Sequence, residues 1–256
     1  MEVIPYLAGA RETEAVAAVV LHRLRDRHIG VYHEVTEMPG GAPQLGPGQV
    51  LSHDAARDFS QRLSGASTVR QILPAAVLVA DSDLLVWHRP ALRRPIIFQT
   101  QDKQLNADVS GRPVLHPPLL FVGRPGKIAV YALTGPERPV ADTPLFRAPY
   151  FNLYATGSMC EGNVPLPPAP TPTDDTLAGY EAAFYDSAFV HTNLGNSNII
   201  KWSSGHAGFW RDMKSTVHFP NQALIPLRTG GKPLTVGNVL ASRIASVDPD
   251  RLETNA

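Results

Sequence analysis

Apolar runs separated by short polar turns dominate the middle of the chain. The runs 118–122 and 128–133 flank Gly123-Arg124-Pro125-Gly126. A four-residue loop rich in glycine and proline between apolar runs is typical of a β-hairpin. Three further runs precede them, at 75–80, 84–87 and 95–98. No helical pattern interrupts these runs. They therefore predict an antiparallel β-meander and an α+β fold class.

Two helices are predicted, one on each side of this strand-rich block. Ser52 is suited to cap a helix that runs to about Leu63, with one apolar stripe along its length. Residues 173–175, Thr-Asp-Asp, offer caps for a second helix over about 176–188. The spacing places four of its residues on the inner face: Leu177, Tyr180, Phe184 and Ala188.

The rest of the chain has weaker patterns. Apolar segments at 15–23 and 29–35 predict a small N-terminal β element, and the glycine- and proline-rich residues 40–48 predict a linker. Residues 165–172 contain too many prolines for a central helix or strand, so they predict an ordered loop or polyproline II.

Length and pattern together suggest how the chain is divided. The 256 residues are enough for one large domain or two small ones. We expect an N-terminal β extension over 1–50 that packs on a core over 51–200. A C-terminal extension follows over 201–256, and its tail is expected to be partly disordered.

Composition narrows the function classes. Lys plus Arg equals Asp plus Glu at 23 each, so no overall field attracts nucleic acid or an anionic membrane. No apolar run reaches the roughly 20 residues that a membrane helix needs, and no signal peptide is apparent at the N-terminus. A single cysteine cannot form an internal disulfide, which favours a reducing cytoplasm.

Cys160, that single cysteine, lies in a polar segment bounded by Gly157 and Gly162. A structural cysteine lies more often within an apolar run, so this setting favours an accessible thiol. Asn152 lies eight positions earlier, and an amide beside a nucleophilic thiol is suited to donate to an oxyanion. The residues alone leave two interpretations open: a nucleophile, or a small apolar residue of a core.

His191 is one of nine histidines and follows the predicted helix 176–188. Its position alone favours a residue at a helix end, where a positive charge suits the helix dipole. The other eight histidines show no metal-ligand spacing, and Gly230-Gly231-Lys232 lacks the remaining residues of a phosphate loop. The pattern therefore predicts neither a metal site nor a nucleotide site.

The spacing before Cys160 resembles that of ubiquitin-conjugating enzymes. Asn152, Gly157, Ser158 and Met159 occupy the places where those enzymes have an asparagine, a glycine, a small polar residue and an aliphatic residue before the catalytic cysteine. The order of helix, meander, turn, cysteine and later helix is also similar. The chain more closely resembles the bacterial E2-like family called PRTRC system protein B. Three segments carry this resemblance: Ala148-Pro149-Tyr150-Phe151-Asn152, Cys160-Glu161-Gly162-Asn163-Val164 and Ala188-Phe189-Val190-His191-Thr192-Asn193.

The resemblance implies a function and partners. The core over 51–200 would have the ubiquitin-conjugating-enzyme fold. Cys160 would accept a ubiquitin-like protein as a thioester from a ThiF-type activating enzyme and transfer it to an amine. Asn152 would be the oxyanion donor, and His191 would act as a base or orient the amine. The resemblance also implies a plasmid or mobile-element setting with a JAB-type peptidase encoded nearby, and no cofactor.

One departure and two alternatives accompany this hypothesis. Tyr150 and Phe151 stand where ubiquitin-conjugating enzymes have His and Pro. A tyrosine hydroxyl can replace the hydrogen bonds of that histidine, whereas the fixed φ of proline is lost. A non-catalytic module with the same fold that binds a ubiquitin-like protein is the alternative. A DNA-maintenance accessory protein is a weaker one, since no basic cluster is present.

Overall fold

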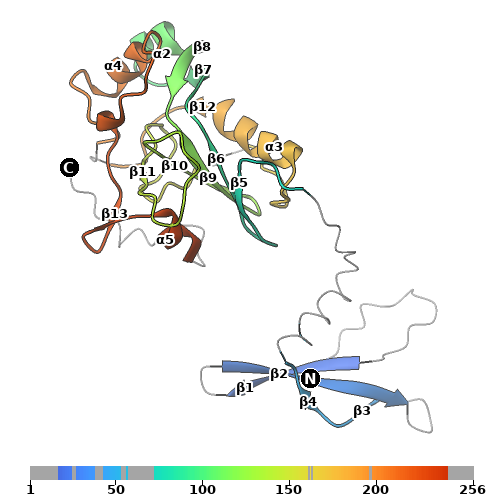
Figure 1. The fold of residues 1–256 in the computed structure, drawn as a ribbon. Coiled ribbons are helices and arrows are strands. Elements are labelled where there is room, and N and C mark those ends of the chain that lie inside the picture. Colours follow the sequence, from blue (N-terminus) through green and yellow to red (C-terminus); the bar gives the residue numbers. More distant parts are fainter. Residues whose placement is uncertain are drawn as a thin grey trace. The chain divides into compact units, whose positions relative to one another are not determined.

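The structure, a computed structural model, describes residues 17–24, 27–37, 43–52, 56, 72–160, 162, 164–195 and 198–241. The chain divides into two compact units, Met1–Gln71 and Ile72–Ala256 (Figure 1). This division falls later than the boundary expected after residue 50. Most of the predicted helix over 52–63 and the predicted disordered tail lie outside the described residues. The packing of the N-terminal extension on the core stays a prediction.

The first unit is a small antiparallel sheet. β1 (Ala17–Leu24) and β2 (Arg27–Glu37) form a hairpin, as the two apolar segments predicted. β3 (Pro43–Leu45) and β4 (Gln49–Val50) also pair with β2, so the stretch predicted to be a linker contains a strand. None of the side chains described in this unit is buried.

An antiparallel five-stranded sheet forms the centre of the second unit, with strand order β11-β10-β9-β6-β5. Its strands are β5 (Val77–Ala80), β6 (Leu85–Arg89), β9 (Leu119–Arg124), β10 (Lys127–Ala132) and β11 (Phe146–Arg147). Four of them contain apolar runs of the predicted meander. The structure has the α+β class that the sequence predicted.

An excursion between β6 and β9 contains the predicted apolar run 95–98 in a separate sheet, and it adds a helix and a strand that the sequence did not predict. β7 (Leu92–Phe98) is followed by helix α2 (Lys103–Val109) and by β8 (Arg112–His116), which pairs with β7. β12 (Ala188–Phe189) pairs with β7 in parallel. Ala188 therefore lies in a strand and not at the end of the predicted helix. That helix, α3, spans Asp174–Tyr185.

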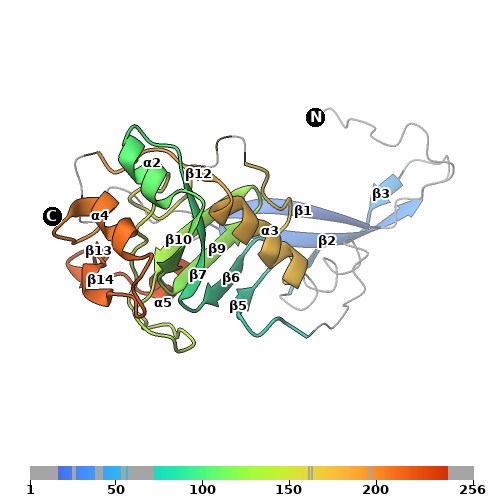
Figure 2. The ribbon, with the colours of Figure 1, turned by 90° about the horizontal axis from the view of Figure 1, so that it is seen from above.

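The sequence at the start of α3 explains where the helix begins. The Thr173 side chain accepts a hydrogen bond from the Thr176 amide at 3.2 Å. Asp174 and Asp175 occupy the first turn, where negative charge is favoured. Tyr180 and Phe184 then pack against Trp87 and Phe121 of the sheet, which fixes α3 on one sheet face (Figure 2).

The C-terminal part of the chain packs on both faces of the central sheet. It contains α4 (Gly205–Asp212), η1 (Asn221–Ala223), β13 (Arg228–Thr229), β14 (Lys232–Pro233) and α5 (Val236–Ala241). Phe209 and Trp210 of α4 join the core on the α3 side. Leu227, Leu234 and Val236 cover the opposite face. Residues of this part therefore contribute to the apolar layers on both faces of the sheet.

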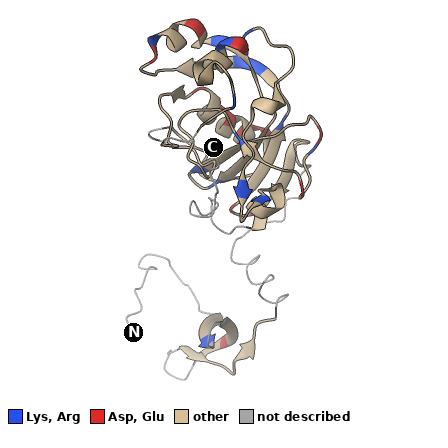
Figure 3. Ribbon diagram, turned by 90° about the vertical axis from the view of Figure 1, so that its left-hand side faces the viewer, with Lys and Arg blue, Asp and Glu red and all other residues tan. Residues whose placement is uncertain are grey.

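The charged residues are distributed as the equal numbers of basic and acidic residues suggest. Basic and acidic residues are interspersed over the second unit (Figure 3). None of the helices described is long and apolar enough to cross a membrane.

Candidate active site

Cys160 ends a tight hairpin that begins at Asn152. The Cys160 amide donates to the Asn152 carbonyl at 2.7 Å, and the Tyr154 amide donates to the Ser158 carbonyl at 2.9 Å. The turn closes through a 2.9 Å bond from the Gly157 amide to the Tyr154 carbonyl. The eight-residue spacing of asparagine and cysteine thus places the two residues opposite each other.

Gly157 is required at this turn for two reasons. Its φ is +83°, in the region that disfavours side chains. A Cβ atom there would also lie 2.6 Å from the Tyr131 ring. The turn therefore lies directly on a buried residue of β10, at a distance that only glycine permits.

The hairpin is attached to the edge of the central sheet. The Val130 amide donates to the Gly157 carbonyl, and the Met159 amide donates to the Ile128 carbonyl, both at 2.9 Å. Met159 and Leu153 are buried, whereas Cys160 is half-buried with a free thiol. Cys160 thus follows the last residue that is bonded to β10. This position is consistent with the predicted loop at a sheet edge.

The Asn152 side chain pairs with β12 and the residue after it as a peptide group would. Nδ2 donates to the Ala188 carbonyl at 2.8 Å, and Oδ1 accepts from the Val190 amide at 3.0 Å. Asn152 has a φ of +60°, a conformation that asparagine tolerates better than most residues. Nδ2 carries two protons, and the bond to Ala188 uses one of them.

His191 is brought next to this hairpin by its main chain. The Asn152 amide donates to the His191 carbonyl at 3.0 Å, and the His191 side chain is exposed. Cys160, Asn152 and His191 are therefore linked by two successive backbone hydrogen bonds, although 31 positions separate Cys160 from His191. Glu161 and Asn163, two residues of the motif around Cys160, lie outside the described residues.

Tyr150 stands where ubiquitin-conjugating enzymes have histidine, and its hydroxyl forms a hydrogen bond, as predicted. Its hydroxyl lies 2.8 Å from Nδ1 of His116, and Nε2 of that buried histidine lies 3.1 Å from the Arg94 carbonyl. A carbonyl only accepts, so Nε2 carries the proton, and the tyrosine donates to Nδ1. Burial lowers the pKa of His116 to about 4, which keeps the ring neutral.

Phe151 rests on His206, a histidine whose role the sequence did not reveal. The two rings stack with centroids 4.3 Å apart. Nε2 of His206 lies 3.0 Å from both the Pro149 carbonyl and the Trp210 indole nitrogen. Burial lowers the pKa of His206 to about 4. The spacing of four residues between His206 and Trp210 places both on one helix face, and it was the sequence signal that could have indicated this contact.

The comparison with protein families identifies the chain at family level. Prokaryotic E2 family D matches residues 57–227, which is more than half of the chain and includes the whole hairpin. The chain belongs to this family. Membership confirms the predicted prokaryotic E2-like resemblance and relates the chain to ubiquitin-like conjugation. No match was found among curated proteins or among solved structures.

Proposed function

We propose that this member of prokaryotic E2 family D is a transferase that carries a ubiquitin-like protein on Cys160. The observation that carries the proposal is the hydrogen bond between the Cys160 amide and the Asn152 carbonyl, within the part of the chain that matches the family. It pairs the main chain of Cys160, whose thiol is free and half-buried, with that of Asn152, whose side-chain amide is held by Ala188 and Val190. A ThiF-type activating enzyme would supply the ubiquitin-like protein.

The reaction consists of two acyl transfers. The Cys160 thiolate attacks the carbonyl carbon of the thioester on the activating enzyme. A new C–S bond forms, the old one breaks, and the sulfur of the activating enzyme leaves as a thiolate. An amine then attacks the Cys160 thioester, loses a proton and releases the Cys160 thiolate. Each transfer passes through a tetrahedral intermediate with one oxyanion.

Asn152 is the proposed oxyanion donor. Its amide is held at both ends by the main chain of 188–190, so donation to an oxyanion requires little reorganisation. Losing one such donor typically raises the barrier by about 2.7–4 kcal/mol. His191 is the proposed base or orienting group. Its carbonyl accepts a hydrogen bond from the Asn152 amide, and its side chain is exposed.

Reconstitution tests this proposal directly. The protein is mixed with a ThiF-type activating enzyme, its ubiquitin-like protein and ATP, and the products are separated with and without dithiothreitol. We expect an adduct that dithiothreitol cleaves and that Cys160→Ala abolishes. Cys160→Ser should give an oxyester that resists dithiothreitol.

The charged activating enzyme is the control in this experiment. If the activating enzyme carries its own thioester and the protein acquires none, the catalytic proposal fails. Binding of the ubiquitin-like protein without an adduct would then identify a non-catalytic module. The proposal also includes the PRTRC affiliation and a JAB-type peptidase encoded nearby. Identifying the proteins that support the reaction would test both.

A further inference from the structure

A small cavity lies beside the hairpin 152–160, and we refer to it as the Arg147 cavity. Its volume of about 10 Å³ is the space that one water molecule or one oxygen atom occupies. Arg147 of β11 is the one charged residue among those that line it, and most of the others are apolar. Four lining residues belong to the hairpin: Leu153, Tyr154, Ala155 and Gly157. The cavity therefore holds a single positive charge in apolar surroundings.

The guanidinium of Arg147 is buried and only partly bonded. The residue is 7% exposed, and Nη1 donates to the Asn198 carbonyl. Nε is buried and has no hydrogen-bond partner among the described residues. The Nε and Nη2 protons lie side by side on one edge of a guanidinium, and this edge matches the two oxygens of a carboxylate. The bond from Nη1 leaves that edge available for a further ligand.

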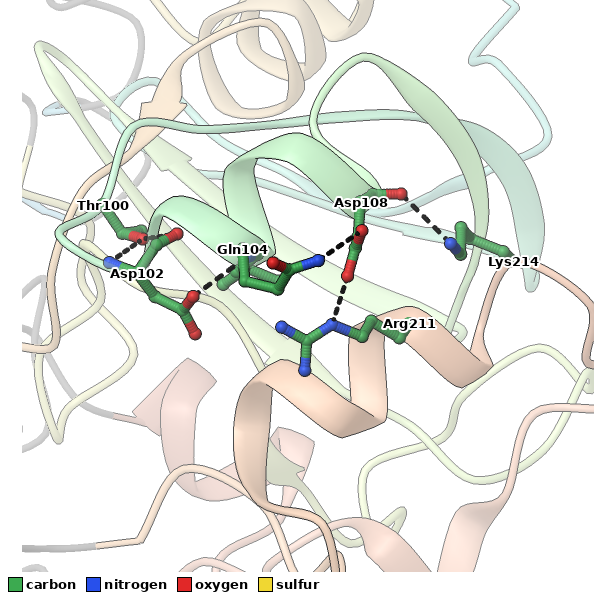
Figure 4. Close-up of polar contacts among 7 residues, drawn as sticks. Thr100, Asp102, Gln104, Asp108, Arg211 and Lys214 are labelled. Atoms are coloured by element: carbon green, nitrogen blue, oxygen red, sulfur yellow. Dashed lines mark hydrogen bonds and ion pairs between the residues drawn. The ribbon is translucent and has the colours of Figure 1, made fainter.

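Other arginines of the second unit pair with carboxylates of the same chain. Arg211 pairs with Asp108 at 2.8 Å (Figure 4), and Arg89 pairs with Glu181 at 2.7 Å. No ion pair within the described ranges involves Arg147. Burial lowers the pKa of Arg147 because it disfavours the charged form, yet a guanidinium stays charged near neutral pH. An anion in the cavity would offset this cost.

The charge and size of the cavity select the kind of anion. One guanidinium balances one negative charge, so a phosphate dianion would bring a second charge into apolar surroundings without a partner. A carboxylate is a monoanion, and it can place one oxygen in a cavity of this size while the rest of the molecule stays outside. Tyr154 lines the cavity and is 46% exposed, so the cavity borders on the protein surface.

We propose that the Arg147 cavity is a binding site for a single carboxylate group, with one oxygen on Nε and the other on Nη2. Two sources share this chemistry: a small free carboxylic acid, and an aspartate or glutamate side chain of a partner protein. The bound carboxylate would contact the hairpin 152–160 and stabilise the segment that ends at Cys160. The inference does not depend on the proposed transferase function.

NMR titration of the whole chain tests this proposal. The ¹⁵Nε–¹Hε resonance of Arg147 is assigned by its connection to the main chain and by its loss in Arg147→Lys. Sodium acetate is compared with sodium chloride at equal ionic strength. We expect acetate, and not chloride, to shift this resonance with half-saturation at roughly 10–100 mM, the range of one weak contact.

Two variants locate the effect. Ala155→Leu keeps the guanidinium and fills the cavity, so it should abolish the response to acetate. Arg112→Lys replaces an exposed arginine that does not line the cavity and should keep the wild-type response.

A pair of peptides distinguishes the two sources of the carboxylate. Acetyl-Gly-Asp-Gly-amide carries one carboxylate, and acetyl-Gly-Asn-Gly-amide carries none. Tighter binding of the aspartate peptide than of acetate would identify a partner protein as the source, and binding of acetate alone would identify a small acid. Three results would overturn the site: no saturable shift with acetate or the aspartate peptide, an equal shift with chloride or the asparagine peptide, or a shift that persists in Ala155→Leu.

Discussion

At the scale of single residues, the side chain of Asn152 makes hydrogen bonds that the backbone of a neighbouring strand would otherwise make. Its amide both donates to and accepts from the main chain of 188–190, as a residue of a neighbouring strand would. Its backbone meanwhile binds Cys160 and His191. Asn152 therefore has a structural role whatever its role in chemistry, and the two roles must be separated by the choice of substitution.

Substitutions of Asn152 separate these roles. Asn152→Gly keeps the φ of +60° without strain, whereas Asn152→Ala adds about 1 kcal/mol of backbone cost. Both remove the amide, so both should lower the free energy of unfolding by a further 1–3 kcal/mol or so. If Asn152 donates to the oxyanion, both should also slow thioester discharge more than loading. Denaturant titration and single-turnover discharge measure the two effects. Lower stability with normal discharge would leave Asn152 a purely structural residue.

The buried His116 predicts a pH dependence of stability. The unfolded ring has a pKa near 6.5, and burial lowers the folded pKa to about 4. Between these values the unfolded chain binds a proton that the folded chain does not. The free energy of unfolding therefore has its full value above about pH 6.5, and it decreases as the pH falls towards 4. The loss is on the order of 3 kcal/mol.

Denaturant titrations between pH 7 and pH 4 measure this slope. His116→Gln should reduce the slope, whatever it does to the stability at pH 7. His218→Gln replaces an exposed histidine and should keep the wild-type slope. Equal slopes in all three proteins would contradict the assignment to His116. His206, whose pKa is also lowered to about 4, adds to the slope in the same direction.

At the scale of elements, the hairpin 152–160 depends on one glycine for its contact with β10. Gly157→Ala must place a Cβ atom 2.6 Å from the Tyr131 ring at a φ of +83°. We expect it to lower the free energy of unfolding by roughly 2–5 kcal/mol and to reduce thioester formation, because the hairpin must move away from β10.

Gly126→Ala is the matched control for this prediction. Its φ is +64°, but nothing lies within 4 Å of the added Cβ atom. It carries the backbone cost of about 1 kcal/mol without the clash, and thioester formation should stay normal. Similar losses in both variants would show that the Tyr131 contact contributes little.

The sequence predicted the elements whose signal is local. The hairpin of β9 and β10 followed from two apolar runs around a Gly/Pro turn, and α3 followed from its caps and spacing. Helix α2 was missed because its residues are mostly polar. Its position also depends on the ion pair between its own Asp108 and Arg211 of α4, which lies about 100 positions later in the sequence. Ala188 was assigned to a helix because its pairing with β7 is long-range.

The candidate site was predictable only in part for the same reason. The spacing of Asn152 and Cys160 reflects a hairpin, which is a local structure. The bonds from Asn152 to Ala188 and Val190, and the stacking of Phe151 on His206, join segments far apart in the sequence. No periodicity marks such contacts, so the sequence did not predict them.

At the scale of the whole molecule, the second unit is a central sheet with apolar layers on both faces. α3 and α4 cover one face, and the segment from Leu227 to Val239 covers the other. The family match spans 57–227 and therefore covers most of the first of these layers. The residues that position the candidate site belong to this matched part.

The first unit has a different energetic basis, because none of its described side chains is buried. Within the residues described there, the strands are joined by their backbone ladder, and a small sheet whose side chains are not buried is marginally stable. We expect the amide hydrogens of β1 and β2 to exchange with deuterium far sooner than those of β9 and β10. Mass spectrometry of peptides from each unit measures this difference. Equal protection would contradict it. Two such stabilities in one chain mean that a single melting temperature reports on the second unit alone.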